Sequence, residues 1–546
     1  MTENLLNDTD SKICLDEFLP NTNDFSTDIQ LPEENNEISI RELLLKNDVN
    51  ISEIQARAVH AADKALSEGI KALTGEERLY YAYFLVTHSY KKNAKGEASK
   101  PIHKAIADLV LLDLDIFILN GDAYIYNNKN GTFERDENGK RVCGKIRSLL
   151  EFEFIEDKII TAIYNLIMTD EKITISDNDI NLRPAHWVHF TNGYYDYKTD
   201  SLYNHNPKYH EIGVIPWEYS ESKYPTTYKL KKIGSGSLTE ILSEPLLFNS
   251  WLNEAIPNIE DQKMILQYIG YAMTLETTAQ KFLMICGSGG TGKSTLLSII
   301  EKIIGRNNIS CVSLQGLQER FTPAELYLKQ ANICADIPLS ALSEIDMIKK
   351  LTGEDLISAE RKFKNNFNFK SFARLFFSAN DIPVNLSDKS NAFYRRMLIL
   401  KMDKAPEVVD IELSKKLESE IPNIITRAME ELYLSEGVIE ESENSKRLVK
   451  EAYKNSDTVE AFISDRCILD EKAKTDRASL YSAYYNYCLY EDRKNVTKSN
   501  FYKQLESKGF PSRRNKTNFD VCGIEINNVI NMPGVNNYSS AGLSVP

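Results

Sequence analysis

The chain has 546 residues, of which 42% are hydrophobic and 26% are charged. This composition excludes a fibre, a peptide hormone and a wholly disordered chain, and the length predicts more than one domain. A net charge of -14 argues at first against a nucleic-acid partner, because binding of phosphates depends on Lys and Arg.

The acidity is concentrated at the amino terminus. Residues 1–40 contain ten acids and one base, which together contribute -9 of the net charge. We expect residues 1–50 to form an acidic flexible tail. The eight cysteines lack metal-ligand spacing, and the longest apolar run, residues 106–119, is too short and too acidic to span a bilayer. No leader sequence opens the chain, so we expect a cytoplasmic protein.

Residues 51–235 predict a mixed module that precedes the rest of the chain. Helical periodicity runs through residues 54–70 and 79–87, and short strands are expected at 124–126, 131–134 and 189–196. Residues 110–116 are expected to form an apolar strand that carries Asp113 and Asp115 on one face, as two-metal polymerases require. A primase is therefore one alternative activity, although the further carboxylate and histidine that it needs do not follow in order.

A phosphate-binding motif begins at Gly287. An apolar run over residues 281–287 leads into Gly287-Ser-Gly-Gly-Thr-Gly-Lys-Ser294, which matches G-x-x-x-x-G-K-[ST] and opens an apolar-periodic segment. We expect Lys293 and the backbone amides to bind ATP phosphates and Ser294 to bind Mg²⁺. The predicted ATP site comprises Gly287, Ser288, Gly289, Gly290, Thr291, Gly292, Lys293, Ser294 and Thr295.

Three further polar positions follow apolar strands downstream. Asp336 ends a strand 43 residues after Lys293, where an acid can hold Mg²⁺, and Asn380 ends the next strand 44 residues later. Arg395 and Arg396 directly precede another apolar strand, where a guanidinium can act on a neighbouring subunit's nucleotide, and Arg396 is the preferred residue. The predicted catalytic set is Lys293, Asp336, Asn380, Arg395 and Arg396, with Ser294 and Asp336 as metal ligands.

The order of these motifs, with Ser378-Ala-Asn380 at the third strand, resembles superfamily 3 helicases. More narrowly, residues 348–364, 388–396, 192–196 and 267–272 resemble the primase–helicase family of phages, plasmids, poxviruses and pathogenicity islands, which includes replication initiators. The resemblance implies a hexameric AAA+ ring that hydrolyses ATP and moves on single-stranded DNA. In relatives, the strand that corresponds to the one before Asp336 commonly ends with two adjacent acids. Here Asp336 has no acidic neighbour in the sequence. The catalytic base is therefore Asp336 itself or one of Glu344, Glu354 and Asp355.

Two basic segments are predicted DNA contacts. Residues 357–363 and 367–373 flank a turn-forming Lys364-Asn-Asn, so they predict a hairpin with Arg361, Lys362 and Lys364 near its tip; the alternative is an ordinary solvated surface. Residues 491–520 carry eight bases and four acids, and their helices resemble the winged helix-turn-helix of the same family. Its expected DNA contacts, with protein docking as the alternative role, are Lys498, Lys503, Arg513 and Arg514.

The sequence therefore predicts an α/β motor of the AAA+ P-loop fold with a parallel central sheet over residues 236–440, and a winged helix over 441–546. The predicted function is an ATP-dependent DNA helicase and replication initiator of a mobile element. The alternatives are an origin-binding protein whose ATPase switches assembly, a helicase with a degenerate primase module, and a protein-remodelling machine. The expected partners are single-stranded and duplex DNA including an origin, further copies in a hexamer, and a separate primase or polymerase, with no membrane.

Overall fold

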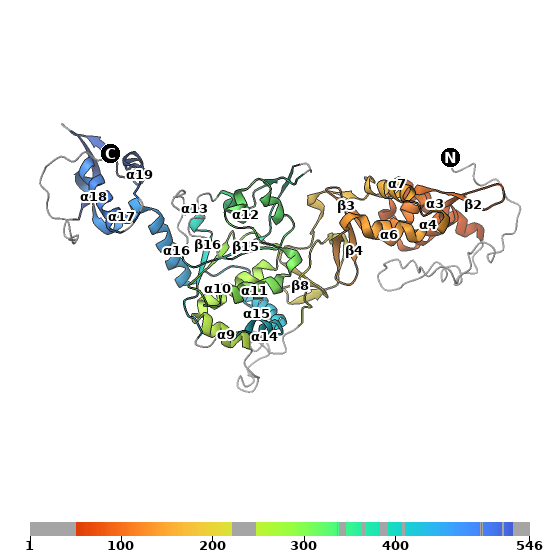
Figure 1. The fold of residues 1–546 in the computed structure, drawn as a ribbon, viewed down its shortest axis with the longest axis horizontal. Helices are drawn as coiled ribbons and strands as arrows, with labels where there is room; N and C mark the ends of the chain where they lie inside the picture. Colours follow the sequence, from red (N-terminus) through yellow and green to blue (C-terminus); the bar gives the residue numbers. More distant parts are fainter. Residues whose placement is uncertain are drawn as a thin grey trace. The chain divides into compact units, whose positions relative to one another are not determined.

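The computed structural model describes residues 51–220, 247–335, 337, 346–362, 366–382, 391–406, 410–491, 493, 495–515 and 518–527 (Figure 1). The acidic tail and the proposed boundary at residue 235 lie outside these ranges. Two compact units are present: one holds residues up to Leu182 with Asn206–Ile212, and the other holds Arg183–His205 with Gly213 onward. None of the helices in the described ranges is long and apolar enough to cross a membrane.

The first unit packs helices against a four-stranded sheet. Its helices are α3 (Ile51–Glu68), α4 (Gly75–Thr87), α5 (His103–Asp113), α6 (Lys140–Leu149) and α7 (Asp157–Met168). Its sheet has the order β5 (Thr132–Arg135), β4 (Asp122–Asn127), β3 (Ile116–Leu119) and β6 (Thr174–Ile175). A separate ribbon pairs β1 (Tyr90–Lys92) with β2 (Ala98–Pro101). The helices predicted at 54–70 and 79–87 are confirmed, apart from a short 3₁₀ turn at 70–72, as are the strands at 124–126 and 131–134.

The predicted apolar strand at residues 110–116 is wrong. Helix α5 runs to Asp113, and β3 begins only at Ile116. The Asp113 carboxylate is paired with the ammonium of Lys145 at 2.7 Å. Because a buried helix and a buried strand both appear as an unbroken apolar run, periodicity does not distinguish them here. The two carboxylates therefore do not share one strand face, and the feature that favoured a primase is lost.

The second unit contains a five-stranded, wholly parallel sheet, which confirms the predicted α/β class. The strand order is β11 (Ile309–Ser310), β12 (Ala331–Cys334), β15 (Arg374–Ala379), β10 (Phe282–Cys286) and β16 (Met397–Lys401). The helices near it are α9 (Leu247–Ala255), α10 (Ile259–Ala272), α11 (Lys293–Ile304), α12 (Asp346–Thr352), α13 (Asn391–Tyr394), α14 (Leu413–Glu418) and α15 (Ile421–Leu434). Figure 1 shows this sheet at the centre of the second unit, among these helices.

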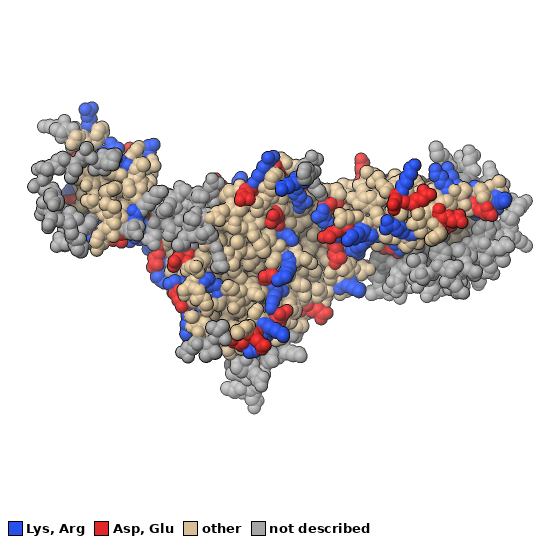
Figure 2. All heavy atoms as spheres, in the orientation of Figure 1, with Lys and Arg blue, Asp and Glu red and all other residues tan. Residues whose placement is uncertain are grey.

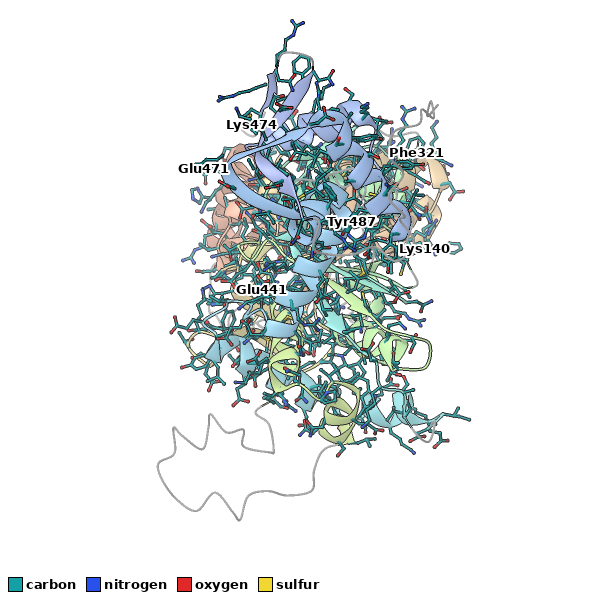
Figure 3. The ribbon with its side chains drawn as sticks, turned by 90° about the vertical axis from the view of Figure 1, so that its left-hand side faces the viewer. Lys140, Phe321, Glu441, Glu471, Lys474 and Tyr487 are labelled. Atoms are coloured by element: carbon teal, nitrogen blue, oxygen red, sulfur yellow. The ribbon has the colours of Figure 1, made fainter. Side chains whose placement is uncertain are left out.

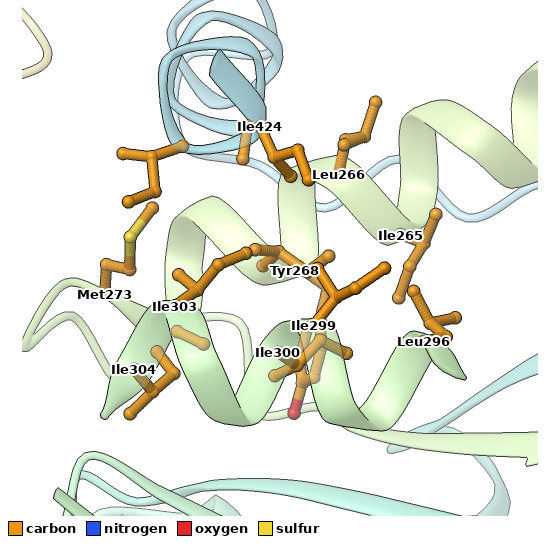
Figure 4. Packing of buried hydrophobic residues seen from close by; sticks show 14 of the residues in the cluster. Ile265, Leu266, Tyr268, Met273, Leu296, Ile299, Ile300, Ile303, Ile304 and Ile424 are labelled. Atoms are coloured by element: carbon orange, nitrogen blue, oxygen red, sulfur yellow. The ribbon is translucent and has the colours of Figure 1, made fainter. Parts of the chain in front are cut away.

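A continuous apolar core holds the strand–helix pair that carries the glycine-rich loop. Ile299 and Ile303 of α11 face Ile265 and Leu266 of α10, and Ile424 of α15 packs beside them (Figure 4). Burying each such side chain contributes about 1.5–3 kcal/mol. Strands β7 (Trp187–Phe190) and β8 (Gly193–Asp196), which pair antiparallel with each other and with β9 (Ser201–Tyr203), contribute buried side chains to this core; β9 contributes none. The beginning and the end of α11 are therefore fixed by packing.

Helix α16 (Glu443–Ser456) belongs to the core of the parallel sheet. Ile399 of β16 donates its backbone N–H to Ser445 Oγ at 2.9 Å, and Leu448 and Ala452 lie in one apolar cluster with β10, β15 and β16. The carboxyl-terminal cluster of buried side chains starts at Val459. The apolar cluster around the parallel sheet therefore includes side chains of α16, which lies after residue 440.

The last part of the chain has three helices and a three-stranded antiparallel sheet. Its elements are α17 (Thr458–Arg466), β17 (Cys467–Asp476), α18 (Arg477–Tyr490), α19 (Lys498–Ser507), β18 (Ser512–Arg514) and β19 (Phe519–Ile526), with strand order β17-β19-β18. Glu471 and Lys474 lie on β17, and Tyr487 lies on α18 (Figure 3). The predicted helices over 480–488 and 499–507 are confirmed, and Leu480, Tyr484 and Tyr487 are buried.

Candidate active site

The glycine-rich loop connects the carboxyl end of β10 to the start of α11. Gly287 donates its backbone N–H to the carbonyl of Ala379, at the end of the neighbouring strand β15, at 3.3 Å. Gly287 has a φ of 154°, and a Cβ on this residue would lie 1.9 Å from the carbonyl oxygen of Met402. Glycine is therefore required here because the backbones of three strands converge.

Lys293 is held inside this loop. Its side chain is buried, and its ammonium donates to the carbonyl oxygens of Gly287 at 2.5 Å and Ser288 at 2.8 Å. Ser294 is exposed beside it. Helix α11 begins after Gly292 with no side chain capping its first N–H groups. Uncapped amides and the positive end of the helix dipole favour an anion at this point.

Among the predicted catalytic residues downstream of the loop, Asn380 lies beside the glycine-rich loop. It follows β15 directly and is exposed, one residue after the Ala379 carbonyl that accepts from Gly287. Asp381 comes next, and its carbonyl accepts a weak hydrogen bond from Cys286 Sγ at 3.7 Å. Burial raises the pKa of the Cys286 thiol to about 12, so this cysteine is not a nucleophile at neutral pH. Asp381 was not singled out from the sequence, although its position after Asn380 made it recognisable.

Trp251 is a second residue near the loop that sequence reasoning missed. A Cβ on Gly292 would approach the indole ring of Trp251 at 3.5 Å and Met402 Cε at 3.3 Å. Trp251 lies on α9, 36 residues before Gly287, and no motif in the sequence links the two. Asp336, Glu344 and Lys364 lie outside the described residues. The strand that leads to Asp336, β12, is separated from β10 by β15 alone.

The two predicted arginines lie at the opposite edge of the sheet. The loop follows the carboxyl end of β10, whereas Arg395 and Arg396 precede the amino end of β16, which is parallel to β10. Arg396 is half-buried and donates from Nη1 to the carbonyl of Ala392 at 2.6 Å. Burial and the neighbouring Arg395 lower the pKa of Arg396, against the opposing effect of Asp355. Arg395 is exposed.

Lys281 fixes the backbone beneath these arginines. Its ammonium donates to the carbonyl of Arg395 at 2.6 Å and forms an ion pair with Glu441 at 2.5 Å. Glu354 accepts from Thr277 Oγ1 at 2.7 Å on the amino side of β10. Glu354 and Asp355 therefore lie with the arginine segment and away from the glycine-rich loop of the same chain. A role for either as the base at that loop has no support from this geometry.

The predicted hairpin is present in shortened form. β13 (Ile357–Ala359) pairs antiparallel with β14 (Phe367–Phe369). The Arg361 guanidinium lies over two rings, 5.1 Å from the centroid of Tyr327 and 4.9 Å from that of Phe367. Lys362 is exposed. Arg361 is therefore partly occupied by aromatic stacking, and Lys362 is the more available cation.

The basic residues of the carboxyl-terminal part divide into two groups. Lys508 is bound internally, by Asp457 at 2.8 Å and Glu460 at 2.6 Å. The four predicted DNA contacts are exposed: Lys498, Lys503, Arg513 and Arg514. On the face shown in Figure 2, basic and acidic side chains are interspersed over the described residues, so net charge alone does not identify a binding surface.

Three segments match known family models. Residues 147–257 match "D5 N terminal like", residues 454–529 match "Poxvirus D5 protein-like", and residues 285–396 match a family of unknown function, DUF5906. A stretch of 180 residues is 24% identical to "Putative helicase L207/L206" of Acanthamoeba polyphaga mimivirus. The chain is thus similar, over separate segments, to D5-like proteins including those of poxviruses and to a viral protein named as a helicase. The stretch covers 32% of this chain and 18% of the viral relative.

The chain also has low similarity to solved structures of the NrS-1 C-terminal region. The apo structure of the NrS-1 C-terminal region, residues 305–718, is 12% identical, covers 77% of this chain and 98% of its own, and has a TM-score of 0.44. The A form of the apo C-terminal region is also 12% identical, covers 76% of this chain and 98% of its own, and has a TM-score of 0.43.

Proposed function

We propose that this chain is an ATP-hydrolysing DNA helicase of a replication system that works as a ring of identical subunits. The observation that carries the proposal is the glycine-rich loop, with buried Lys293 and an uncapped helix, beside exposed Asn380. The domain matches and the helicase-named viral relative support a role in replication. The superfamily 3 resemblance supports the ring.

The geometry of the loop supports binding of a nucleoside triphosphate, with Mg²⁺ as the proposed metal ion. The Lys293 ammonium already bonds to two carbonyl oxygens, which are weak partners that anionic phosphate oxygens can replace. Gly289 and Gly290 leave the space beside them open, since a Cβ on either meets no atom within 4 Å. Ser294 and Asp336 are the proposed metal ligands. Bound Mg²⁺ would neutralise phosphate charge, and Asn380 would orient the attacking water.

A ring explains why loop and arginines occupy opposite edges of one sheet. Arg395 and Arg396 lie at the amino end of β16 and the loop lies at the carboxyl end of the parallel strand β10. Head-to-tail packing would bring these arginines to the loop of the next copy. The Lys281 bond to the Arg395 carbonyl would hold that segment in place. ATP turnover then requires assembly.

The DNA contacts proposed for this machine come from two places. Lys362 and Lys364 would meet single-stranded DNA in the centre of the ring, with Arg361 at the base of the hairpin. The carboxyl-terminal part is proposed as a winged helix, with α19 in the major groove and Arg513 and Arg514 at the start of the wing. Recognition of an origin by this part would make the protein an initiator.

The test is ATPase activity of the full chain with and without single-stranded DNA. A helicase predicts stimulation by the single strand, whereas an initiator that only switches assembly predicts none. Removing residues 457–546, which leaves α16 in the motor core, separates the activities. Loss of sequence-specific duplex binding with retained stimulation supports the proposal, and loss of stimulation by an intact ring contradicts it.

A further inference from the structure

A ribbon in the first unit concentrates positive charge. Residues 90–101, which form β1, a turn and β2, contain four lysines and one acid, Glu97. All four lysines are exposed. In the described part of the chain, Lys91, Lys95 and Lys100 form no salt bridge. Among the described residues, the charges of these three lysines are therefore not used in internal salt bridges.

The strand register places like charges against each other. Lys91 lies directly opposite Lys100. Cross-strand partners have Cβ atoms only about 5 Å apart, so two ammonium groups at one such pair destabilise the ribbon. Side chains alternate between faces along a strand, so Lys92 lies on the face opposite to Lys91. The ribbon thus presents cations on both faces, and Lys95 adds another in the turn.

The turn is ordered, and its single acid is already bound. Asn93 Oδ1 accepts from the backbone N–H groups of Lys95 at 2.8 Å and Glu97 at 3.0 Å. Asn93 Nδ2 donates to the Glu97 carboxylate at 2.9 Å. At the base, Tyr90 packs on Phe154 with ring centroids 5.5 Å apart. The ribbon is a defined element anchored at its base, where Pro101 is buried, and Lys91, Lys92, Ser99 and Lys100 are exposed.

We infer that this ribbon, residues 90–101, is a contact surface for duplex DNA, separate from the proposed pore and winged helix. The choice of DNA as the partner rests on the proposed function. A two-stranded ribbon fits the major groove, about 12 Å wide, where phosphates flank it on both sides. Cations on both faces match that arrangement, whereas an acidic peptide would neutralise one face. Phosphates would also relieve the repulsion between Lys91 and Lys100.

The test compares two variants of the full chain with equal changes in charge. The ribbon variant is K91Q/K92Q/K95Q/K100Q. The control replaces four exposed lysines of the same unit that lie outside the ribbon: K129Q/K140Q/K158Q/K208Q. The measurement is affinity for a short duplex as a function of NaCl concentration. Each lost phosphate contact reduces the slope of log K against log salt by about 0.9, so the ribbon variant should lose about 3–4 in slope.

An unchanged slope for the control supports the inference, and equal slopes for the two variants overturn it. Absence of duplex binding by the unmodified chain also overturns it. ATPase stimulated by single-stranded DNA is measured in parallel: a chain that binds duplex through the ribbon but never hydrolyses ATP refutes the proposed helicase and leaves the ribbon standing. Because Lys91 and Lys100 repel each other, the ribbon variant should melt no lower than the unmodified chain, and a lower Tm contradicts the register argument.

Discussion

The ammonium of Lys293 donates to the carbonyl oxygen of Gly287, the first residue of its own loop, at 2.5 Å. The lysine is thus fixed by the strand end that precedes the loop and by the helix that follows it. In this position the ammonium donates to backbone carbonyl oxygens, which anionic phosphate oxygens can replace.

Replacing Lys293 by Ala should reduce ATP turnover by about 100-fold or more, since one charge-assisted contact to developing phosphate charge is worth that much. Far-UV circular dichroism should be unchanged, because the side chain packs within the loop and not in the apolar core. Steady-state ATPase measures the effect. Near-normal ATP turnover by a folded variant would contradict the assignment of Lys293 to the ATP site.

Gly287 and Gly289 form a matched pair for testing the loop. Gly287→Ala places a Cβ 1.9 Å from the Met402 carbonyl oxygen, so it should destabilise the unit by about 1–3 kcal/mol and abolish nucleotide binding. Gly289→Ala meets no atom within 4 Å and should retain stability. Denaturant titration and binding of a fluorescent nucleotide measure both effects. Equal behaviour of the two variants would argue against the convergence of strands at Gly287.

Arg396→Ala should lower turnover by about 10³-fold while nucleotide binding persists, as expected for a residue that acts on another subunit's nucleotide. Arg395→Ala is the companion variant, because Arg395 is the more exposed of the two. ATPase and nucleotide affinity are measured on both. A fall in nucleotide affinity for Arg396→Ala, with turnover of the bound fraction unaffected, would contradict the trans assignment.

Lys508 and Lys503 should separate stability from DNA binding. Lys508→Met leaves Asp457, which is only 2% exposed, without its cation and should cost about 3 kcal/mol. Lys503→Met, on the exposed face of α19, should weaken DNA binding and leave Tm unchanged.

The carboxylate partners raise the pKa of Lys508. Its stabilisation is therefore complete below the ordinary lysine pKa of 10.5 and is lost as pH rises through the higher folded value. Melting curves at neutral and alkaline pH check both points.

Removing residues 1–40 deletes ten acids and one base. If the tail competes with DNA for basic surfaces such as the ribbon, nonspecific duplex binding should strengthen at low salt, where screening is weak. Filter binding at two salt concentrations measures this. An unchanged affinity for duplex DNA at low salt would contradict competition between the acidic tail and DNA.

The glycine-rich loop could be predicted because its motif is local in the sequence. Contacts between residues far apart in the sequence could not be predicted, because they depend on how the elements pack. The spacing from Gly287 to Ser294 requires a strand before it and a helix after it, and both are present. Asn380 follows from the same logic, because parallel strands end at one edge. Trp251 reaches the loop only through the packing of α9, and Arg361 stacks on Tyr327, 34 residues away. Neither relationship has a periodic signal.

The ribbon shows the same limit in another form. The four lysines are visible in the sequence, but the opposition of Lys91 and Lys100 depends on a register that shifts between Lys91 and Lys92. The apolar run at 110–116 does not identify a helix, because burial on all sides of α5 removes the helical periodicity that would distinguish it from a strand. Helix α16 is mostly polar, so its sequence does not indicate that Leu448 and Ala452 pack against the parallel sheet.

The most direct test of the central claim is strand displacement on a forked duplex with ATP, using the unmodified chain and Lys293→Ala side by side. The account predicts ATP-dependent unwinding by the unmodified chain and none by the variant, with both binding the fork. Unwinding by Lys293→Ala, or ATP hydrolysis by the unmodified ring without any displacement on either 3′- or 5′-tailed forks, would contradict it.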